Sequence, residues 1–330
     1  MGDPAGIGPE VLLAAAAELD ATEQLTAACL FLGDASIFAT CAAQLENIDP
    51  PVTVASAVEA RAAAGNGQPG PFLLECAPVP AGLLPGQPRP GDSAAALAAI
   101  RAGAELAAAG DIDALVTAPL SKHGVAAHEP GFKGHTEFLA AFDGTAFPIM
   151  LFAAPRGEAA PAAADIALLT THLPLATAIA LVRPATVEAA LRRLHVAWAD
   201  RFGRAPAIGV AALNPHGGEQ GRIGGEEPRL LSPAIRAVTD DGIDARGPYP
   251  ADSIFLRDGL DVILALYHDQ GTIMAKRAPW PTVNLTLGLS YVRTSPDHGT
   301  AYDLAGTGRA DHRPMLAAMR LAVQLAARPR

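Results

Sequence analysis

Short apolar runs alternate with longer Ala- and Leu-rich stretches along most of the chain. Residues 95–110 (AALAAIRAGAELAAAG) have helical periodicity, and the strand-like run 113–120 (DALVTAPL) follows them directly. Such alternation predicts an α/β fold in which helices cross a parallel sheet. Further strands are expected within residues 28–34, 148–154, 165–175, 207–218, 261–271 and 282–289, and helices near 186–201, 228–240 and 314–327.

Two stretches interrupt this pattern. Residues 76–92 (CAPVPAGLLPGQPRPGD) are too rich in Pro and Gly for a helix, and we interpret them as a loop within one domain rather than as a linker. Residues 156–165 (RGEAAPAAAD) are expected to form an exposed hairpin or loop. No repeat of 20–50 residues is visible.

Composition narrows the class of protein. A chain of 330 residues that is 50% apolar and 18% charged can bury a large core, in one large α/β unit or in two domains. Its net charge of −10 and its lack of basic runs argue against binding to nucleic acid or to an anionic membrane. The chain shows no export signal, so a cytoplasmic location is expected. The three cysteines, Cys29, Cys41 and Cys76, lack metal or redox spacing and are interpreted as buried thiols.

Three histidines each follow an apolar run that is expected to be a strand: His172, His216 and His268. In open α/β sheets, ligands bind at the carboxyl ends of the strands. Neutral imidazole is the commonest metal ligand, and three protein ligands leave open positions for a substrate oxygen. The three histidines together therefore predict a divalent metal site, although any one of them alone would more often simply end its strand.

Neighbouring polar residues are candidates for orienting these imidazoles. They are Thr170, Thr171, Asn214, Glu219, Asp269 and Gln270. Gly271 is interpreted as a turn residue that closes the run 262–271.

Two further histidines lie in surroundings suited to a ligand. His135 and Thr136 follow a Gly and open an apparent helix, where backbone N–H groups and a hydroxyl can face an anion. His298 stands in a loop of small residues, RTSPDHGTAYDLAGTG, that allows a ligand to approach closely. The remaining histidines, His123, His128, His195 and His312, are interpreted as structural.

Six segments, in order along the chain, resemble the 4-hydroxythreonine-4-phosphate dehydrogenase family. They are GDPAGIGPE (2–10), GHTEFLA (134–140), THLPL (171–175), LNPHGGE (213–219), YHDQG (267–271) and VNLTLGLSYVRTSPDHGTAYDLAG (283–306). The family's fold is similar to that of isocitrate and isopropylmalate dehydrogenases. The glycines of 2–10 are thus not a dinucleotide-binding fingerprint, since the preceding strand and the downstream acid are missing.

The resemblance implies two α/β subdomains with a cleft between them. Residues 1–133 with 285–330 would form the cofactor side, and 134–284 would carry the metal, the substrate contacts and the dimer contacts. It also implies oxidation of 4-phosphooxy-L-threonine with NAD or NADP, followed by decarboxylation to 3-amino-2-oxopropyl phosphate, on the route to pyridoxal 5'-phosphate. The enzyme would be a homodimer with a shared active site.

The resemblance implies a role for each of several residues of this sequence. His172, His216 and His268 would bind one divalent ion, such as zinc, magnesium or cobalt. The substrate contacts would be His135, Thr136, Lys276, Asn284 and Arg293. The cofactor would lie against His298, Gly299, Thr300, Ala301 and Asp303, where the carboxylate of Asp303 favours NAD over NADP because it repels a 2'-phosphate. The candidates for the catalytic base are Lys276, Asp269 and Asp252.

The sequence departs from the family in two places. Members usually carry a short strand before the 2–10 loop, whereas this sequence starts inside that loop, so a sheet strand is expected to be missing or to lie upstream. The segment KRAPWPTVN is Pro-rich where a Gly-rich stretch is usual.

Other functions stay open on the sequence alone. A relative within the same family would act on another phosphorylated hydroxy acid or on a dihydrodiol. A hydrolase or aldolase with a three-histidine metal site, or a catalytically silent binding protein, is a candidate from outside the family.

Overall fold

The computed structural model describes residues 1–23, 28–45, 47–155, 163–279 and 281–327. The chain divides into two compact units, a first unit of Met1–Ala146 with Leu289–Pro329 and a second unit of Phe147–Gly288. The sequence places these boundaries at 133/134 and 284/285. His135 and Thr136 therefore lie in the first unit.

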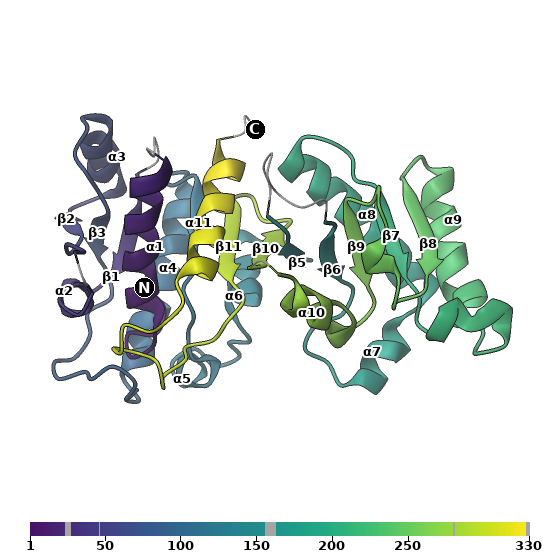
Figure 1. Cartoon of the computed structure of the whole chain (residues 1–330), viewed down its shortest axis with the longest axis horizontal. Coiled ribbons are helices and arrows are strands. Elements are labelled where there is room, and N and C mark those ends of the chain that lie inside the picture. The colour runs from purple at the N-terminus through teal and green to yellow at the C-terminus, as the bar shows by residue number, and fades with distance from the viewer. Residues whose placement is uncertain (24–27, 46, 156–162, 280, 328–330) are drawn as a thin grey trace. The chain divides into compact units, whose positions relative to one another are not determined.

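The first unit combines helices with two sets of parallel strands. Strands β1 (Leu30–Gly33), β3 (Phe72–Glu75) and β2 (Val52–Val54) pair in the order β1-β3-β2, and β4 (Ala114–Val116) pairs with β11 (Val292–Pro296). The helices are α1 (Gly8–Glu23), α2 (Ala35–Ala42), α3 (Ala57–Gly65), α4 (Asp92–Ala109), α5 (Lys122–Ala126), α6 (His135–Asp143) and α11 (Arg313–Ala326). Helices α1 and α11 lie side by side (Figure 1).

The second unit holds a mixed sheet in the order β10-β5-β6-β9-β7-β8. Its strands are β5 (Ile149–Ala153), β6 (Asp165–Leu168), β7 (Ile208–Ala211), β8 (Ala245–Tyr249), β9 (Val262–Ala265) and β10 (Val283–Leu287). The helices are α7 (Leu175–Leu181), α8 (Pro184–Phe202), α9 (Ser232–Asp240) and α10 (His268–Arg277), with short turns η1 (Pro215–Gly221), η2 (Glu227–Leu231) and η3 (Ile254–Leu256).

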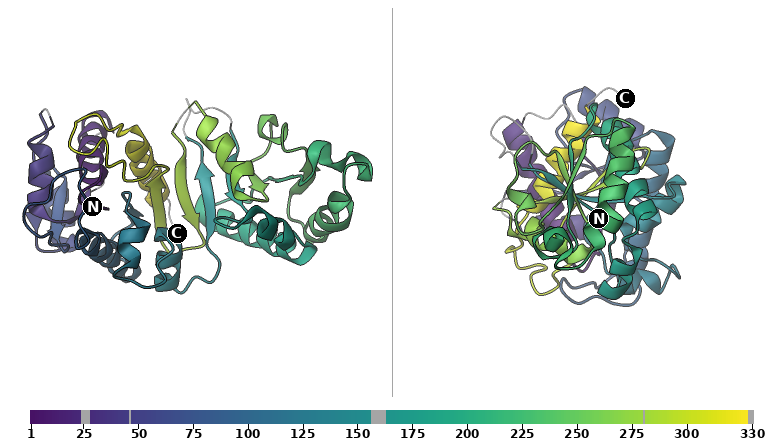
Figure 2. Two further views of the ribbon diagram at one scale, coloured as in Figure 1. Left: turned by 90° about the horizontal axis from the view of Figure 1, so that it is seen from below. Right: turned by 90° about the vertical axis from the view of Figure 1, so that its right-hand side faces the viewer.

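The sheet of the second unit is not wholly parallel, in contrast to the expectation from the sequence pattern. Strands β6, β9, β7 and β8 run parallel, but β5 is antiparallel to both β6 and β10. Figure 2 shows β5 and β10 as neighbouring arrows. The three central strands β6, β7 and β9 are buried at every residue, as expected for parallel strands covered on both faces.

Helix α8 illustrates how the sequence determines an element. Pro184 stands at its first turn, where the missing N–H costs nothing, and Gly203 ends it at a φ of 72°. Its buried residues Val187, Leu191, Leu194, Trp198 and Phe202 recur every three to four positions and make one apolar face.

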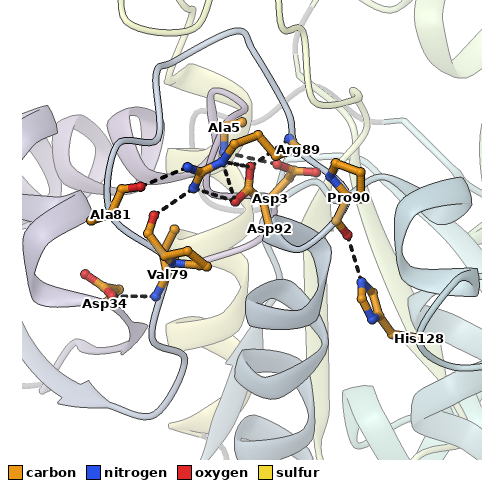
Figure 3. A network of polar contacts seen from close by, with 10 residues as sticks. Asp3, Ala5, Asp34, Val79, Ala81, Arg89, Pro90, Asp92 and His128 are labelled. Carbon is orange, nitrogen blue, oxygen red and sulfur yellow. Dashed lines mark hydrogen bonds and ion pairs between the residues drawn. The ribbon is translucent and has the colours of Figure 1, made fainter.

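The Pro-rich stretch 76–92 is a loop inside the first unit, braced by side chains (Figure 3). Arg89 donates to the carbonyl oxygens of Pro80 and Ala81 at 2.7 and 2.9 Å and pairs with the buried Asp92 at 2.9 Å. The amide of Val79 donates to Asp34 at 2.7 Å. The loop therefore has a defined conformation, and it does not link two domains.

Two local predictions from the sequence are wrong, and a third falls mostly outside the described residues. Gly271 does not close a turn, because α10 begins at His268 and contains it. Residues 293–296, expected in a loop, belong to β11. Of the hairpin or loop expected at 156–165, residues 156–162 lie outside the described residues.

Candidate active site

The three histidines of the expected metal site come after three adjacent parallel strands of the second unit. His172 comes four residues after β6, His268 three residues after β9, and His216 five residues after β7, in the sheet order β6-β9-β7. Parallel neighbours end at the same edge of a sheet. The strand ends thus place all three histidines in loops or at a helix start on this edge.

The structure brings two of these histidines together. The ring centroids of His172 and His268 lie 5.5 Å apart, and two imidazoles on one tetrahedral ion would be roughly 5 Å apart. Asp269 lies 2.7 Å from Nδ1 of His268, an arrangement that fixes the ring and leaves Nε2 for a ligand. The donor chemistry of this pair fits a divalent cation such as zinc.

The third histidine does not join this pair within one chain. Among the described residues, no group of three or more His, Cys, Asp or Glu side chains could hold a metal ion. His216 is exposed and lies in η1, where residues His216 to Gln220 all have positive φ values between 43° and 76°. This strained loop is held by the buried Glu227, which accepts from the amides of Leu213 and Asn214 at 3.0 and 2.7 Å.

Several of the residues that were expected to orient the imidazoles make other contacts instead. Thr170 donates to the carbonyl oxygen of Leu266, and Gln270 bonds Leu266 and Ala212, so both tie neighbouring strand ends together. The side chain of Asn214 donates to Glu226 and Glu227. Asp269 contacts a predicted metal ligand, His268.

Three more predicted residues lie in the second unit. Lys276 is exposed in the last turn of α10, and Asp252 is exposed after β8. Asn284 lies on β10, and its buried Oδ1 atom has no hydrogen-bond partner in the described part of the chain. A buried acceptor in that state suits a ligand that donates a hydrogen bond.

In the first unit, Arg293 is the centre of a compact polar cluster. Its side chain is 2% exposed, and it donates to the hydroxyl of Thr117 at 2.7 Å and contacts that of Thr136 at 3.5 Å. Burial lowers the pKa of the guanidinium to about 10. A buried cation beside two hydroxyl groups attracts an anion strongly, because little water is left to solvate the charge.

His135 begins α6 next to this cluster. Burial, and then the nearby charge of Arg293, lower the pKa of its imidazole well below 6.5. The ring is therefore neutral at pH 7 and can donate one hydrogen bond. The helix has Gly134 as N-cap, a residue without a side chain to cap the first N–H groups, and the carboxylate of Glu137 lies 3.1 Å from the position of a Cβ built on Gly134.

The residues expected to hold the cofactor form a tight loop in the first unit. Ala301 has a φ of 41°, and the amide of Ile7 donates to the carbonyl oxygen of Thr300 at 2.9 Å. Tyr302 donates to the fully buried Asp3 at 2.7 Å. Gly299 and Asp303 are exposed, and the buried Nε2 of His298 lacks a partner among the described residues. The loop therefore presents polar groups that fit a cofactor.

Sequence reasoning missed Thr117, Lys122 and Asp3. Thr117 follows β4 directly, and the end of the Lys122 side chain lies 3.4–3.6 Å from the position of a Cβ built on Gly134, beside the start of α6. The available signal was that polar residues, Thr117, Ser121 and Lys122, appear directly after the apolar strand in DALVTAPLSK. Asp3 lies in the segment 2–10 that resembles the family, but its contact with Tyr302, 299 residues away, could not be seen in the sequence.

Comparison with known proteins agrees with this arrangement. The family model described as "Pyridoxal phosphate biosynthetic protein PdxA" matches residues 25–322. The chain belongs to this family. A 4-hydroxythreonine-4-phosphate dehydrogenase from Janthinobacterium sp. (strain Marseille) is 41% identical over 344 residues, covering 100% of this chain and 96% of the relative.

Solved structures of PdxA relatives share the fold. A 4-hydroxythreonine-4-phosphate dehydrogenase from Klebsiella pneumoniae has a TM-score of 0.82 at 31% identity, over 99% of this chain and 98% of the other. A terephthalate 1,2-cis-dihydrodiol dehydrogenase from Burkholderia xenovorans LB400 has a TM-score of 0.62 at 30% identity, over 98% and 95%. The expected family and the α/β fold class are confirmed.

Proposed function

We propose that this PdxA-family chain oxidises 4-phosphooxy-L-threonine, using NAD or NADP and a divalent metal ion. The product would be the 3-keto acid, which loses carbon dioxide to give 3-amino-2-oxopropyl phosphate for pyridoxal 5'-phosphate biosynthesis. The full-length similarity to 4-hydroxythreonine-4-phosphate dehydrogenases carries this proposal.

The cluster around Arg293 supports a phosphorylated substrate. In the proposal, Arg293 and Thr136 bind an anionic group of the substrate, and the neutral His135 donates a hydrogen bond to it. The N–H groups at the start of α6 would add to the same attraction. Asn284 and Lys276 are proposed as further substrate contacts.

The metal and the cofactor supply the redox chemistry in this proposal. When bound, a divalent ion would polarise the hydroxyl oxygen to be oxidised, and a nicotinamide would accept the hydride. His172, His216 and His268 would hold the ion, and Asp269 would keep His268 in the correct tautomer. Lys276, Asp269 and Asp252 are the proposed candidates for the base that takes the hydroxyl proton.

The cofactor is proposed to bind at His298, Gly299, Thr300, Ala301 and Asp303. The exposed carboxylate of Asp303 suits a ribose hydroxyl and repels a 2'-phosphate, which favours NAD over NADP.

We also propose that the enzyme is a homodimer with a shared site. Large apolar side chains are exposed on and beside α7 and on α10, next to His172 and His268: Leu173 is 44%, Leu175 55%, Ile179 44% and Ile273 60% exposed. A cluster of this kind is typical of an interface. A second copy could then supply the third histidine that a single chain does not bring to the pair.

The test is an assay of cofactor reduction with purified protein, 4-phosphooxy-L-threonine, NAD and either zinc, magnesium or cobalt. We expect metal-dependent formation of NADH and release of carbon dioxide. Arg293→Met should lower kcat/KM by roughly 10²-fold or more, because a charge-assisted contact to an anion is lost. Circular dichroism would verify that the variant is folded.

A second candidate function is oxidation of a cis-dihydrodiol, as the similarity to the Burkholderia xenovorans protein suggests. Turnover of a terephthalate dihydrodiol without turnover of 4-phosphooxy-L-threonine would replace the first proposal by this one. Absence of NADH formation from NAD and of NADPH formation from NADP, with both substrates, would contradict both proposals.

A further inference from the structure

The Pro-rich loop 76–92 contains a tight turn at Leu84–Gln87. The amide of Gln87 donates to the carbonyl oxygen of Leu84 at 3.1 Å, and Gly86 has a φ of 77°. Pro followed by Gly at the two central positions is typical of a type II turn, whose second central residue needs a positive φ. The segment LPGQ therefore favours this turn on local grounds.

Gly86 lies between two other segments of the first unit. Its amide donates to the carbonyl oxygen of Ala5 at 2.8 Å. A Cβ atom built on Gly86 would lie 2.6 Å from the carbonyl oxygen of Tyr302, which belongs to the cofactor loop, defined as residues 298–306. A side chain at Gly86 would therefore force the backbone of the cofactor loop to move. Glycine is required here both for the positive φ and for the close approach.

The cofactor loop is also held at its end, at Gly306. The amide of Gly306 donates to the buried carboxylate of Glu10 at 2.8 Å. A Cβ atom built on Gly306 would lie 2.6 Å from the Cβ atom of Pro85, the neighbour of Gly86 in the turn. The turn and the segment that contains Glu10 thus both restrict the backbone of the cofactor loop.

The turn can support its neighbours because the loop around it is braced (Figure 3). The side chain of Arg89 donates to the carbonyl oxygens of Pro80 and Ala81, and its amide donates to Asp92 at 2.7 Å. Asp92 is 1% exposed and begins α4. These contacts tie the Pro-rich loop to the first turn of an 18-residue helix, so the turn keeps a fixed place beside the cofactor loop.

We propose that the turn Leu84–Gln87 positions the cofactor loop. Gly86 would hold the carbonyl group of Tyr302, and with it the loop conformation that binds NAD or NADP. The proposal rests on the cofactor site proposed above at residues 298–303. Gly86 is a positioning residue, since it acts through the loop and not through contact with the cofactor. A loop that is already ordered loses less conformational freedom on binding, and this raises the affinity for the cofactor.

The test adds a methyl group at Gly86. Gly86→Ala strains the positive φ and pushes against the carbonyl oxygen of Tyr302. We expect the Kd for NAD, measured by isothermal titration calorimetry, to rise by about tenfold or more. In turnover, KM for NAD should rise likewise, whereas kcat should change by less than about threefold, because binding and not the chemical step is affected. A purely structural role would lower Tm without separating KM for NAD from kcat.

Gly82→Ala is the matched control. Gly82 lies in the same loop with a φ of 79°, and the nearest atom that a Cβ there would meet among the described residues, chain neighbours aside, is Nη1 of Arg89 at 4.0 Å. The control therefore has the same backbone strain without the clash, and its Kd for NAD should be unchanged. If both variants weaken NAD binding equally, strain in the Pro-rich loop is the cause, and the role of the contact with Tyr302 is overturned.

Two further measurements separate this proposal from the cofactor site on which it rests. With no cofactor present, the amides of Leu304 and Gly306 should exchange about tenfold or more faster in Gly86→Ala, and unchanged exchange would overturn the proposal. Asp303→Ala, which removes a proposed cofactor contact, should raise the Kd for NAD. If Asp303→Ala weakens NAD binding and Gly86→Ala does not, the cofactor site stands and the positioning role is overturned. If neither variant changes the Kd, the cofactor site is wrong and this proposal falls with it.

A second pair of variants covers a Gly86→Ala protein that fails to fold. Gly306→Ala adds a methyl group against Pro85 at a φ of 73°, from the other partner of the contact. Its control is Gly308→Ala, with a φ of 66° and nothing within 4 Å of the added Cβ among the described residues. We expect weaker NAD binding in Gly306→Ala alone. Equal Kd values for the two variants would overturn the proposal.

Discussion

At the scale of the residue, burial gives ordinary side chains their binding properties. Arg293 would usually be a solvated surface charge, but here it is 2% exposed, and its two hydroxyl partners come from Thr117 and Thr136. The sequence separations are 176 and 157 residues. The resemblance to the family identified Arg293 as a substrate contact, but no local pattern could predict its burial or its partners.

The neutral state of His135 leads to a pH-dependent contribution to stability. Because its folded pKa lies below the 6.5 of an unfolded histidine, the unfolded chain binds the proton more readily as the pH falls. This contribution is therefore fully present above about pH 6.5 and is lost below it.

We expect the wild-type protein to lose stability, relative to His135→Gln, by up to about 1.4 kcal/mol per pH unit between pH 6.5 and 5. Urea unfolding of both proteins at several pH values measures the difference. Parallel stability curves, or a wild type that gains stability on acidification relative to the variant, would contradict the low pKa.

At the scale of the element, the sequence predicted the strands better than the segments after them. Apolar runs located β1, β4, β5, β6, β7, β9 and β10, but the sequence did not predict β2, β3 and β8, and most of β11 was expected to be a loop. The segment YHDQG was interpreted as a strand end with a turn, but its first residue is the N-cap of α10. The misinterpretation arose because Gly271 has two uses, in turns and in close packing, and the sequence alone does not distinguish them.

Gly271 lets α10 approach the sheet closely. A Cβ atom at this position would lie 2.6 Å from Leu168, 2.9 Å from Ile166 and 3.2 Å from Ala265. We expect Gly271→Ala to destabilise the protein by about 1–3 kcal/mol, because the helix or the three side chains must move. Since His268 is on the same helix, its distance from His172 should change and zinc affinity should fall.

Gly65→Ala in α3 is the matched control, because a Cβ there meets nothing within 4 Å. It should leave zinc affinity unchanged and stability equal or slightly higher. Urea unfolding and zinc titration of both variants measure these effects. A Gly271→Ala protein as stable as wild type would show that α10 is packed more loosely than described.

At the scale of the whole molecule, the sequence predicted the α/β class and the proximity of His172 and His268. It could not show which groups a single chain brings together. The metal set depends on strand order, and β6, β9 and β7 are neighbours although they are far apart in the sequence. Within the described residues, a single chain brings His172 and His268 together without a third ligand. The order of strands in a sheet belongs to tertiary structure, and the number of subunits belongs to quaternary structure. Neither can be predicted from a local sequence pattern.

A shared metal site can be tested by mixing two inactive variants, His216→Ala and His268→Ala. If one copy supplies His216 and the other His268, a mixed dimer has one intact site and one site that lacks both ligands. Random exchange of subunits should then restore about a quarter of the wild-type activity, since half of the dimers are mixed and each has one working site of two.

Ile179→Asp, which places a charge on the exposed face of α7, should weaken the dimer in sedimentation experiments and reduce this recovery. No recovery on mixing, with subunit exchange verified by differently tagged copies, would show that each chain builds its own site.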